Sequence, residues 1–178
     1  MTTDQTIDVA IIGGGPAGYA AAIYAARANL TTTVLEQGMS GGQIATSNEI
    51  ENYPGIPLLS GAELGERFQQ HAEGLGAQVE WSMVTGVDYD ADAVQFTIHH
   101  DMGDTAAKSV IACMGATPRP AGFVGEDTYR GRGVSYCATC DGMFFRGKQV
   151  FVIGGGNSAC EEALFLSDIA SSVTIVLR

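Results

Sequence analysis

The sequence has few basic residues. It holds 9 Lys and Arg against 20 Asp and Glu, and its formal charge is -11. Because such a chain repels phosphates, nucleic acid and anionic membranes are disfavoured as partners. Long hydrophobic runs are also missing, since no apolar stretch approaches the roughly 20 residues that span a bilayer. The first residues, Met1–Asp8, are polar and acidic rather than typical of a signal peptide, so we expect a cytoplasmic protein.

Cysteine and histidine are scarce as well. Four cysteines are too few and too unevenly spaced for a structural disulfide framework. A zinc site normally needs a second Cys-x-x-Cys pair or paired histidines, and the 3 histidines are scattered, so we expect no metal. We expect Cys113 and Cys160 to pack inside apolar segments. One close pair remains, Cys137 and Cys140, with Asp141 beside it, and such a pair in a reducing compartment is typical of redox catalysis.

The N-terminal region predicts a strand, a glycine turn, a helix and a second strand. The β-branched run Ile7–Ile12 leads into Gly13–Gly18, which reads GGGPAG. Tyr19–Ala28 is rich in strong helix formers, and Thr31–Leu35 is predicted to be a second strand, which ends at Glu36. A glycine motif alone is weak evidence, but this order of elements is typical of a Rossmann-like dinucleotide site.

Each motif position of this unit would have a specific role in binding a dinucleotide. Gly13 permits the tight turn, Gly15 lets the backbone approach a pyrophosphate, and Gly18 lets helix and strand pack closely. The helix N-terminus attracts the anion, and Glu36 is placed to accept hydrogen bonds from a ribose. The alternative is a glycine turn in an ordinary βαβ unit. The predicted binding residues are Gly13, Gly15, Pro16, Ala17, Gly18 and Glu36.

The same order of elements occurs again near the C-terminus. The run Gln149–Ile153 leads into Gly154–Ala159, then a helical segment through Leu166, then the run Val173–Leu177. This predicts a second Rossmann-like dinucleotide site, so the fold class is α/β with two such domains. The predicted binding residues here are Gly154, Gly156, Asn157, Ser158, Ala159 and Arg178.

The two units differ where the ribose would lie. Glu36 stands 23 positions after Gly13, whereas the same count from Gly154 reaches Leu177, which Arg178 follows. The acid that selects an unphosphorylated ribose is therefore absent from the second unit, and a cation stands near the place of a 2′-phosphate. This favours NADPH over NADH there.

Between the two units we expect one helix, Gly61–Gly74, and a three-stranded β-meander. Segments 41–46 and 51–55 are rich in turn formers and are expected to cover a cofactor. The expected strands are Val79–Val87, Val94–His99 and Ser109–Cys113, joined by turns at Asp88–Asp92 and Asp101–Thr105. Two prolines within 115–120 break the pattern, and the domain boundary is placed there.

These motifs together resemble the N-terminal part of low-molecular-weight thioredoxin reductases. The resemblance rests on the two glycine turns, on the GGQ and ENYPG stretches at 41–43 and 51–55, and above all on CATCDG at 137–142. It implies an FAD-binding domain at 1–116 and an NADPH-binding domain at 117–178, both incomplete in this chain. It also implies FAD contacts from Gly42, Gln43, Asn52, Val84 and Gly115.

The resemblance further implies a route for electrons. They pass from NADPH to FAD, then to the Cys137–Cys140 pair, then to the disulfide of a thioredoxin. Cys140 is implied to lie nearest the flavin and Cys137 to attack the protein substrate, with Asp141 as the acid/base. A homodimer is implied as well. The alternatives are a flavoprotein that reduces a peroxiredoxin, a ferredoxin-fed or flavin-fed relative, and a truncated remnant without activity.

Overall fold

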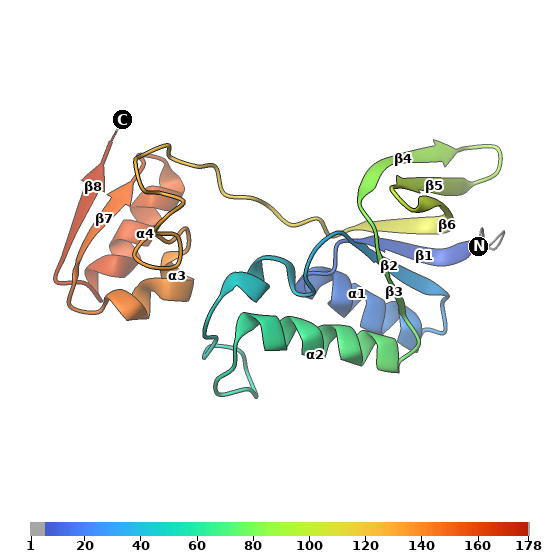
Figure 1. Ribbon diagram of the computed structural model, residues 1–178, viewed down its shortest axis with the longest axis horizontal. Helices are drawn as coiled ribbons and strands as arrows, with labels where there is room; N and C mark the ends of the chain where they lie inside the picture. The colour runs from blue at the N-terminus through green and yellow to red at the C-terminus, as the bar shows by residue number, and fades with distance from the viewer. Residues whose placement is uncertain (1–5, 178) are drawn as a thin grey trace. The chain divides into compact units, whose positions relative to one another are not determined.

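The computed structural model describes residues 6–177 and divides the chain into two compact units. The first ends at Ala116 and the second begins at Thr117. Both combine strands with helices, which confirms the predicted α/β class (Figure 1). Within the described residues, no helix is long and apolar enough to cross a membrane.

The first unit contains a six-stranded sheet with the order β3-β2-β1-β6-β5-β4. Its strands are β1 (Ile7–Ile12), β2 (Thr32–Glu36), β3 (Gln78–Trp81), β4 (Val84–Asp90), β5 (Gln95–His100) and β6 (Gly103–Ala112). Its helices are α1 (Pro16–Arg27), the 3-10 helix η1 (Gly42–Thr46) and α2 (Gly61–Gly74). The strands β3, β2, β1 and β6 are parallel, and β4 and β5 are antiparallel additions.

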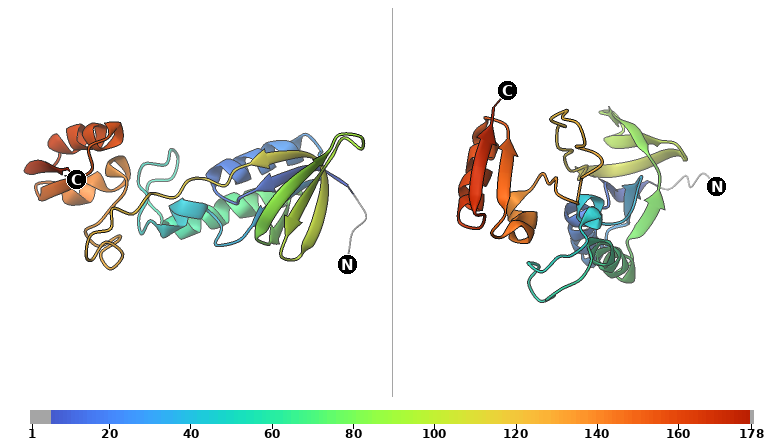
Figure 2. Two further views of the ribbon diagram at one scale, coloured as in Figure 1. Left: turned by 90° about the horizontal axis from the view of Figure 1, so that it is seen from above. Right: turned by 60° about the vertical axis from the view of Figure 1, so that its left-hand side comes forward.

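Alternating side chains of β1 divide the core into two parts. Helices α1 and α2 lie on one face of the sheet (Figure 2), and Val9 and Ile11 pack with them there. Ala10 and Ile12 face the other side and pack with Ile98 of the meander strand β5. Because successive side chains of a strand point to opposite faces, β1 is buried from both sides, as a central parallel strand requires.

The meander differs in detail from the expectation. The predicted strand Val79–Val87 is two strands, because Ser82 and Met83 interrupt it: the Ser82 N–H donates to the Glu36 carbonyl, and the Met83 N–H donates to the Asp101 carboxylate. As a result β3 extends the parallel sheet and only β4 belongs to the meander.

The last meander strand is also longer than predicted. β6 begins at Gly103, inside the expected turn Asp101–Thr105, and β4 continues to Asp90, inside the other expected turn. The first half of β6 pairs with β5, the second half pairs with β1, and Ala107 pairs with both. One strand therefore joins the meander to the parallel sheet.

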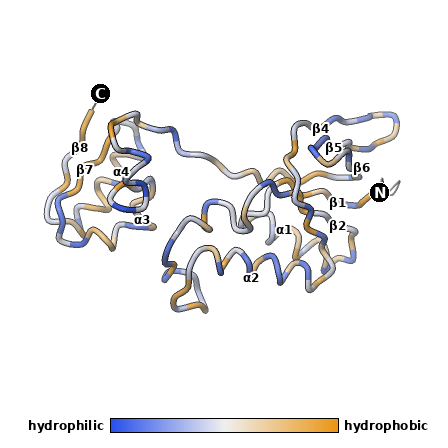
Figure 3. The backbone as a smooth tube through the Cα atoms, in the orientation of Figure 1, coloured by the Kyte–Doolittle hydropathy of each residue, from blue (hydrophilic) through white to orange (hydrophobic). Residues whose placement is uncertain are grey.

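The second unit is a smaller α/β unit. It contains a short helix α3 (Ala138–Asp141), the 3-10 helix η2 (Gly142–Phe145), β7 (Gln149–Ile153), α4 (Asn157–Ser167) and β8 (Ser172–Val176). β7 and β8 form a parallel pair and are mostly hydrophobic, whereas polar and apolar residues alternate along α2 of the first unit (Figure 3).

Helix α4 uses Ala163 and Leu166 for its buried face. Cys160 lies in the first turn of this helix and is exposed, so the expectation that it packs onto the sheet was wrong. Cys113, by contrast, is half-buried and packs against the core below α1, and its burial raises the pKa of the thiol.

Candidate functional site

The first glycine turn lies at the carboxyl ends of the parallel strands. Gly13 follows β1 with a φ of +106°, and a Cβ at this position would overlap the carbonyl oxygen of Cys113. A Cβ at Gly18 would overlap the carbonyl oxygen of Gly13. Both glycines are thus required by close backbone packing, one for the turn and one for the approach of α1.

Gly15 has a different environment. It precedes α1 in an extended conformation, and a Cβ there would meet only the Gly41 carbonyl oxygen, at 4.0 Å. The space over the first turn of α1 is therefore open to a ligand. Because the N–H groups of a first helical turn lack partners within the helix, this opening fits the pyrophosphate of a dinucleotide.

Glu36 ends β2 beside this turn and is almost fully buried, with 9% of its surface exposed. One carboxylate oxygen accepts from the Gly14 N–H at 2.5 Å, and the other accepts from the Gly38 N–H at 2.7 Å. The carboxylate is therefore held at the edge of the turn by backbone amides. Each oxygen keeps a second lone pair that a ribose hydroxyl can use.

Most of the other residues predicted to contact FAD lie around the same turn. Gly42 approaches Gly15 closely, since a Cβ at Gly42 would lie 3.4 Å from the Gly15 Cα, and Gln43 follows it in η1. Val84 begins β4, two residues after the Ser82 N–H that bonds to Glu36. Gly115 lies just beyond β6 in the left-handed region, with φ +67°.

Asn52 is the exception among these residues. It is exposed in the loop 47–60 that joins η1 to α2, near the short bridge between Tyr53 and Ile56. No hydrogen bond within residues 6–177 ties its side chain to the first glycine turn.

The second glycine turn repeats the first at a constant spacing of 141 positions, from Gly13 to Gly154. The Gly13 N–H donates to the Leu35 carbonyl, and the Gly154 N–H donates to the Val176 carbonyl. Gly156 precedes α4 in the same extended conformation as Gly15, with nothing within 4 Å of a Cβ built on it. The second turn thus offers the same kind of opening.

The two glycine turns differ in the side chain that lies beside them. A Cβ on Gly14 would meet the Glu36 side chain at 3.1 Å, and a Cβ on Gly155 would meet the Leu177 side chain at 2.7 Å. Leu177 therefore fills, beside the second turn, the place that Glu36 fills beside the first. The next residue, Arg178, lies outside the described residues.

Cys137 and Cys140 form a disulfide, with their Cα atoms 5.3 Å apart. Cys137 is half-buried and precedes α3, and Cys140 lies exposed within it. The Cys137 sulfur accepts hydrogen bonds from the Cys140 N–H at 3.3 Å and from the Thr139 hydroxyl at 3.4 Å.

Asp141 is held near the pair by a serine that the sequence did not single out. The Ser135 hydroxyl donates to the Asp141 carboxylate at 2.5 Å and accepts from the Cys137 N–H at 3.1 Å. A serine two residues before a backbone N–H often forms such a bond, so the spacing was the available signal.

The segment before the dithiol is anchored by another buried carboxylate. Glu126 accepts from the Tyr136 hydroxyl at 2.6 Å and from the N–H groups of Ala121 and Gly122. The hydrogen bond from Tyr136 is the largest cause that lowers the pKa of Glu126, and it raises the pKa of Tyr136. This bond fixes the residue next to Cys137.

The dithiol helix packs onto α4. Ala138 is buried, and a Cβ on Gly142 would meet Phe165 of α4 at 3.1 Å. α3 therefore lies close to the helix that follows the second glycine turn, within the same unit.

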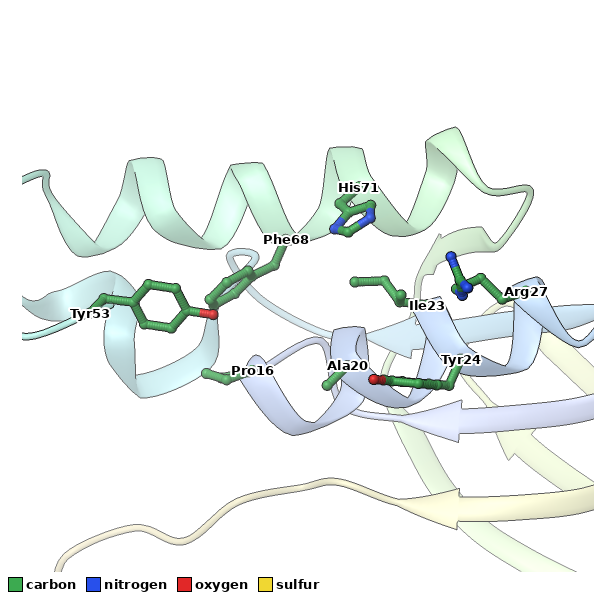
Figure 4. Close-up of a pocket in the computed structure, with 8 residues that line it drawn as sticks. All are labelled: Pro16, Ala20, Ile23, Tyr24, Arg27, Tyr53, Phe68 and His71. Atoms are coloured by element: carbon green, nitrogen blue, oxygen red, sulfur yellow. The ribbon is translucent and has the colours of Figure 1, made fainter. Parts of the chain in front are cut away.

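A separate cavity of about 460 Å³ lies between α1 and α2 (Figure 4). Aromatic and aliphatic side chains dominate its lining, and the rings of Tyr53 and Phe68 pack at a tilt with centroids 5.6 Å apart. Of the predicted binding residues only Pro16 lines it, so it does not coincide with either glycine turn. The residues described contain no cluster of acids, histidines and cysteines that fits a metal ion.

Comparison with known proteins gave consistent matches. The family described as pyridine nucleotide-disulphide oxidoreductase matches residues 7–178. The thioredoxin reductase of Bacillus subtilis is 42% identical over all of this chain and 56% of its own length. The glucosaminate ammonia-lyase of Pseudomonas fluorescens is 44% identical over 96% of this chain and 53% of its own length.

Solved structures match as well. The crystal structure of thioredoxin reductase from Streptococcus pyogenes superimposes with a TM-score of 0.88 and 42% identity, over 97% of this chain and 56% of that one. The chain thus spans about half the length of the relatives that it matches.

Proposed function

Because the chain belongs to the pyridine nucleotide-disulphide oxidoreductase family, we propose that it carries the FAD site, the redox dithiol and the NADPH site of a thioredoxin reductase. The observation that supports this most directly is the Cys137–Cys140 disulfide, which is followed by the second of two matching dinucleotide turns. The relatives named thioredoxin reductase point the same way.

The chain's own residues suit both cofactors. The open first turn of α1, with Gly15 and the backbone of Gly42 beside it, would hold the pyrophosphate of FAD, and Glu36 would accept from its ribose. The open turn at Gly156 would hold NADPH. Bound FAD supplies a carrier that takes two electrons from a reduced pyridine nucleotide and gives them to a disulfide.

The choice of NADPH rests on Leu177. Its apolar side chain fills the place where an acid would accept from an unphosphorylated ribose, so nothing there repels a 2′-phosphate. Arg178, the next residue, would add a charge-assisted hydrogen bond to that phosphate.

The reduced pair then performs thiol–disulfide exchange. The Cys137 thiolate attacks one sulfur of the thioredoxin disulfide, a mixed disulfide forms, and the electron pair of the broken bond stays on the other thioredoxin sulfur. Cys140 attacks Cys137 next, which restores the intramolecular disulfide and releases the second thioredoxin sulfur. Asp141 exchanges the protons with the thiols.

One relative is named as an ammonia-lyase, which is a different reaction class. The dithiol favours the reductase, because elimination of ammonia needs no sulfur pair. We also propose that the protein is a homodimer. Light scattering on the purified protein measures the molar mass that tests this.

The test is an assay of the protein expressed from its complete open reading frame and loaded with FAD. We expect oxidation of NADPH that depends on thioredoxin, much slower oxidation of NADH, and loss of thioredoxin reduction in Cys137→Ser and in Cys140→Ser. The flavin spectrum separates the two variants, because Cys140→Ser is expected to stop electrons at the reduced flavin. Near-normal turnover in either variant contradicts the dithiol mechanism, and activity only with reduced ferredoxin contradicts the choice of donor.

A further inference from the structure

We propose that Thr139 is a positioning residue that concentrates the negative charge of the reduced dithiol on Cys137. The inference rests on the proposed function in one respect, that the pair cycles between disulfide and dithiol. It adds a residue with an assigned role to the three that the sequence pointed to.

In the hydrogen bond between Thr139 and Cys137, the donor can be identified. The Thr139 oxygen lies 3.4 Å from the Cys137 sulfur. A sulfur in a disulfide has no hydrogen to give, so the Thr139 hydroxyl is the donor. The Cys140 N–H, 3.3 Å away, is a second donor to the same sulfur.

The pair is therefore asymmetric. Two donors point at the Cys137 sulfur, whereas no hydrogen bond within residues 6–177 reaches the sulfur of Cys140. Hydrogen bonds strengthen when the acceptor becomes charged, so they stabilise a thiolate on Cys137 more than a neutral thiol there.

Within residues 6–177, no hydrogen bond joins the nearest carboxylate in the chain, that of Asp141, to either sulfur. The Asp141 carboxylate is bound by the Ser135 hydroxyl, and Ser135 contacts Cys137 through the backbone N–H rather than through the sulfur. Of the two donors to the sulfur, the Cys140 N–H is a backbone group that is present whatever the side chain. The Thr139 hydroxyl is therefore the donor that a substitution can remove.

The test measures alkylation of the reduced protein, expressed from its complete open reading frame and before FAD is added. Dithiothreitol is removed, a limiting amount of iodoacetamide is added at about pH 7, where thiolates rather than thiols react, and labelled peptides are quantified by fragmentation mass spectrometry. Cys160, which is exposed and lies on another helix, serves as the reference thiol within each sample. The variants are Thr139→Val, which keeps the shape without the hydroxyl, and Thr139→Ser, which keeps the hydroxyl.

We expect Cys137 to be labelled faster than Cys140 in the unchanged chain and in Thr139→Ser. In Thr139→Val the Cys137 rate relative to Cys160 should fall roughly tenfold, because one hydrogen bond to a charged group is worth about that factor. Equal labelling of both cysteines in the unchanged chain, or a Thr139→Val rate equal to that of the unchanged chain, overturns the proposal. A loss in Thr139→Ser as large as in Thr139→Val also overturns it, since the hydroxyl would not be the cause.

A failure of this inference can be told apart from a failure of the proposed function. Labelling needs no flavin, pyridine nucleotide or thioredoxin, so a chain that shows the expected asymmetry but reduces no thioredoxin would leave this inference standing and refute only the proposed substrate. The circular dichroism spectrum reports whether each variant is folded.

Discussion

Glycines of the first turn are required for two separable reasons. At Gly18 a side chain would overlap the carbonyl oxygen of Gly13, whereas at Gly15 it would enter open space. We therefore expect Gly18→Ala to lower the free energy of unfolding by about 1 to 3 kcal/mol, as overpacking does. Urea unfolding followed by circular dichroism measures it.

Gly15→Ala is the matched control. Its extended backbone accepts alanine without strain, so stability should change little, whereas flavin binding should weaken because the methyl group occupies the space of the pyrophosphate. A Gly15→Ala protein that binds FAD as tightly as the unchanged protein would show that this opening is not the cofactor site.

The acid beside the dithiol gives a second prediction at this scale. Asp141→Asn keeps the size and the contact with Ser135 but cannot exchange a proton. We expect the disulfide to form normally and thioredoxin reduction to slow by a factor on the order of 10² to 10⁴. Rapid-mixing kinetics of the reduced protein measure the rate, and an unchanged rate would remove Asp141 from the mechanism.

Among the helices, α2 has the most complete N-terminal cap. The Ser60 hydroxyl accepts from the Glu63 N–H at 3.2 Å, and the Glu63 carboxylate accepts from the Ser60 N–H at 3.1 Å. Ser60→Ala should therefore reduce stability by about 1 kcal/mol, and Ser60→Asp, another good capping residue, should keep most of it. Thermal unfolding of the two variants tests this, and equal melting temperatures would contradict it.

The same cap is sensitive to acid. The hydrogen bonds from Ser60 lower the pKa of Glu63 in the folded protein. The stabilising effect of the cap is thus present at pH values above the pKa of Glu63 in the unfolded chain, about 4.3. It is lost as the pH falls through the lower pKa of the folded protein.

The meander contains a contact whose contribution to stability depends on pH in the opposite direction. His99 of β5 lies 2.8 Å from Asp104 of β6 and 3.0 Å from Asp88 of β4, and these hydrogen bonds raise the pKa of the imidazole. The stabilisation is fully present at pH values below the pKa of His99 in the unfolded chain, about 6.5. It is lost as the pH rises through the higher pKa of the folded protein.

We expect the melting temperature of the unchanged protein to fall between weakly acidic and alkaline pH by more than that of His99→Gln, which cannot become charged. His71→Gln is the control, because His71 lies on α2, away from the meander. Parallel pH profiles for the unchanged protein and His99→Gln would rule out this contact as the cause.

At the scale of the whole molecule, the division at Ala116 predicts where a protease cuts first. Residues 113–123 form no helix or strand, and Val124 is fully exposed. Thermolysin, which cleaves before large apolar residues, should cut before Phe123 or Val124 and release two folded pieces. Mass spectrometry of a time course shows the order, and a first cut in the loop 47–60 would contradict the prediction.

Patterns within one element predicted much of this architecture, and contacts between elements account for the rest. The first strand, glycine turn and helix were predictable from periodicity, and α2 spans the predicted Gly61–Gly74. The break at Ser82 was missed because both of its causes are distant, a carbonyl of β2 and a side chain after β5. The sequence likewise located the dithiol, but not the contacts of Ser135 and Thr139, because hydroxyls are common and only geometry shows which one meets a sulfur.

The double pairing of Ala107 affects how the chain can fold during synthesis. β1 pairs with β6 from Ile7 opposite Ala107 onward, so its second neighbour is translated about a hundred residues later. At roughly 5 to 20 residues per second, the ribosome delivers that neighbour about 5 to 20 seconds after β1. During this interval the nascent β1 has an open edge. The hairpin of β4 and β5, translated just before β6, has no strand linking it to the parallel sheet until β6 follows. Completion of the first core therefore waits for the emergence of β6.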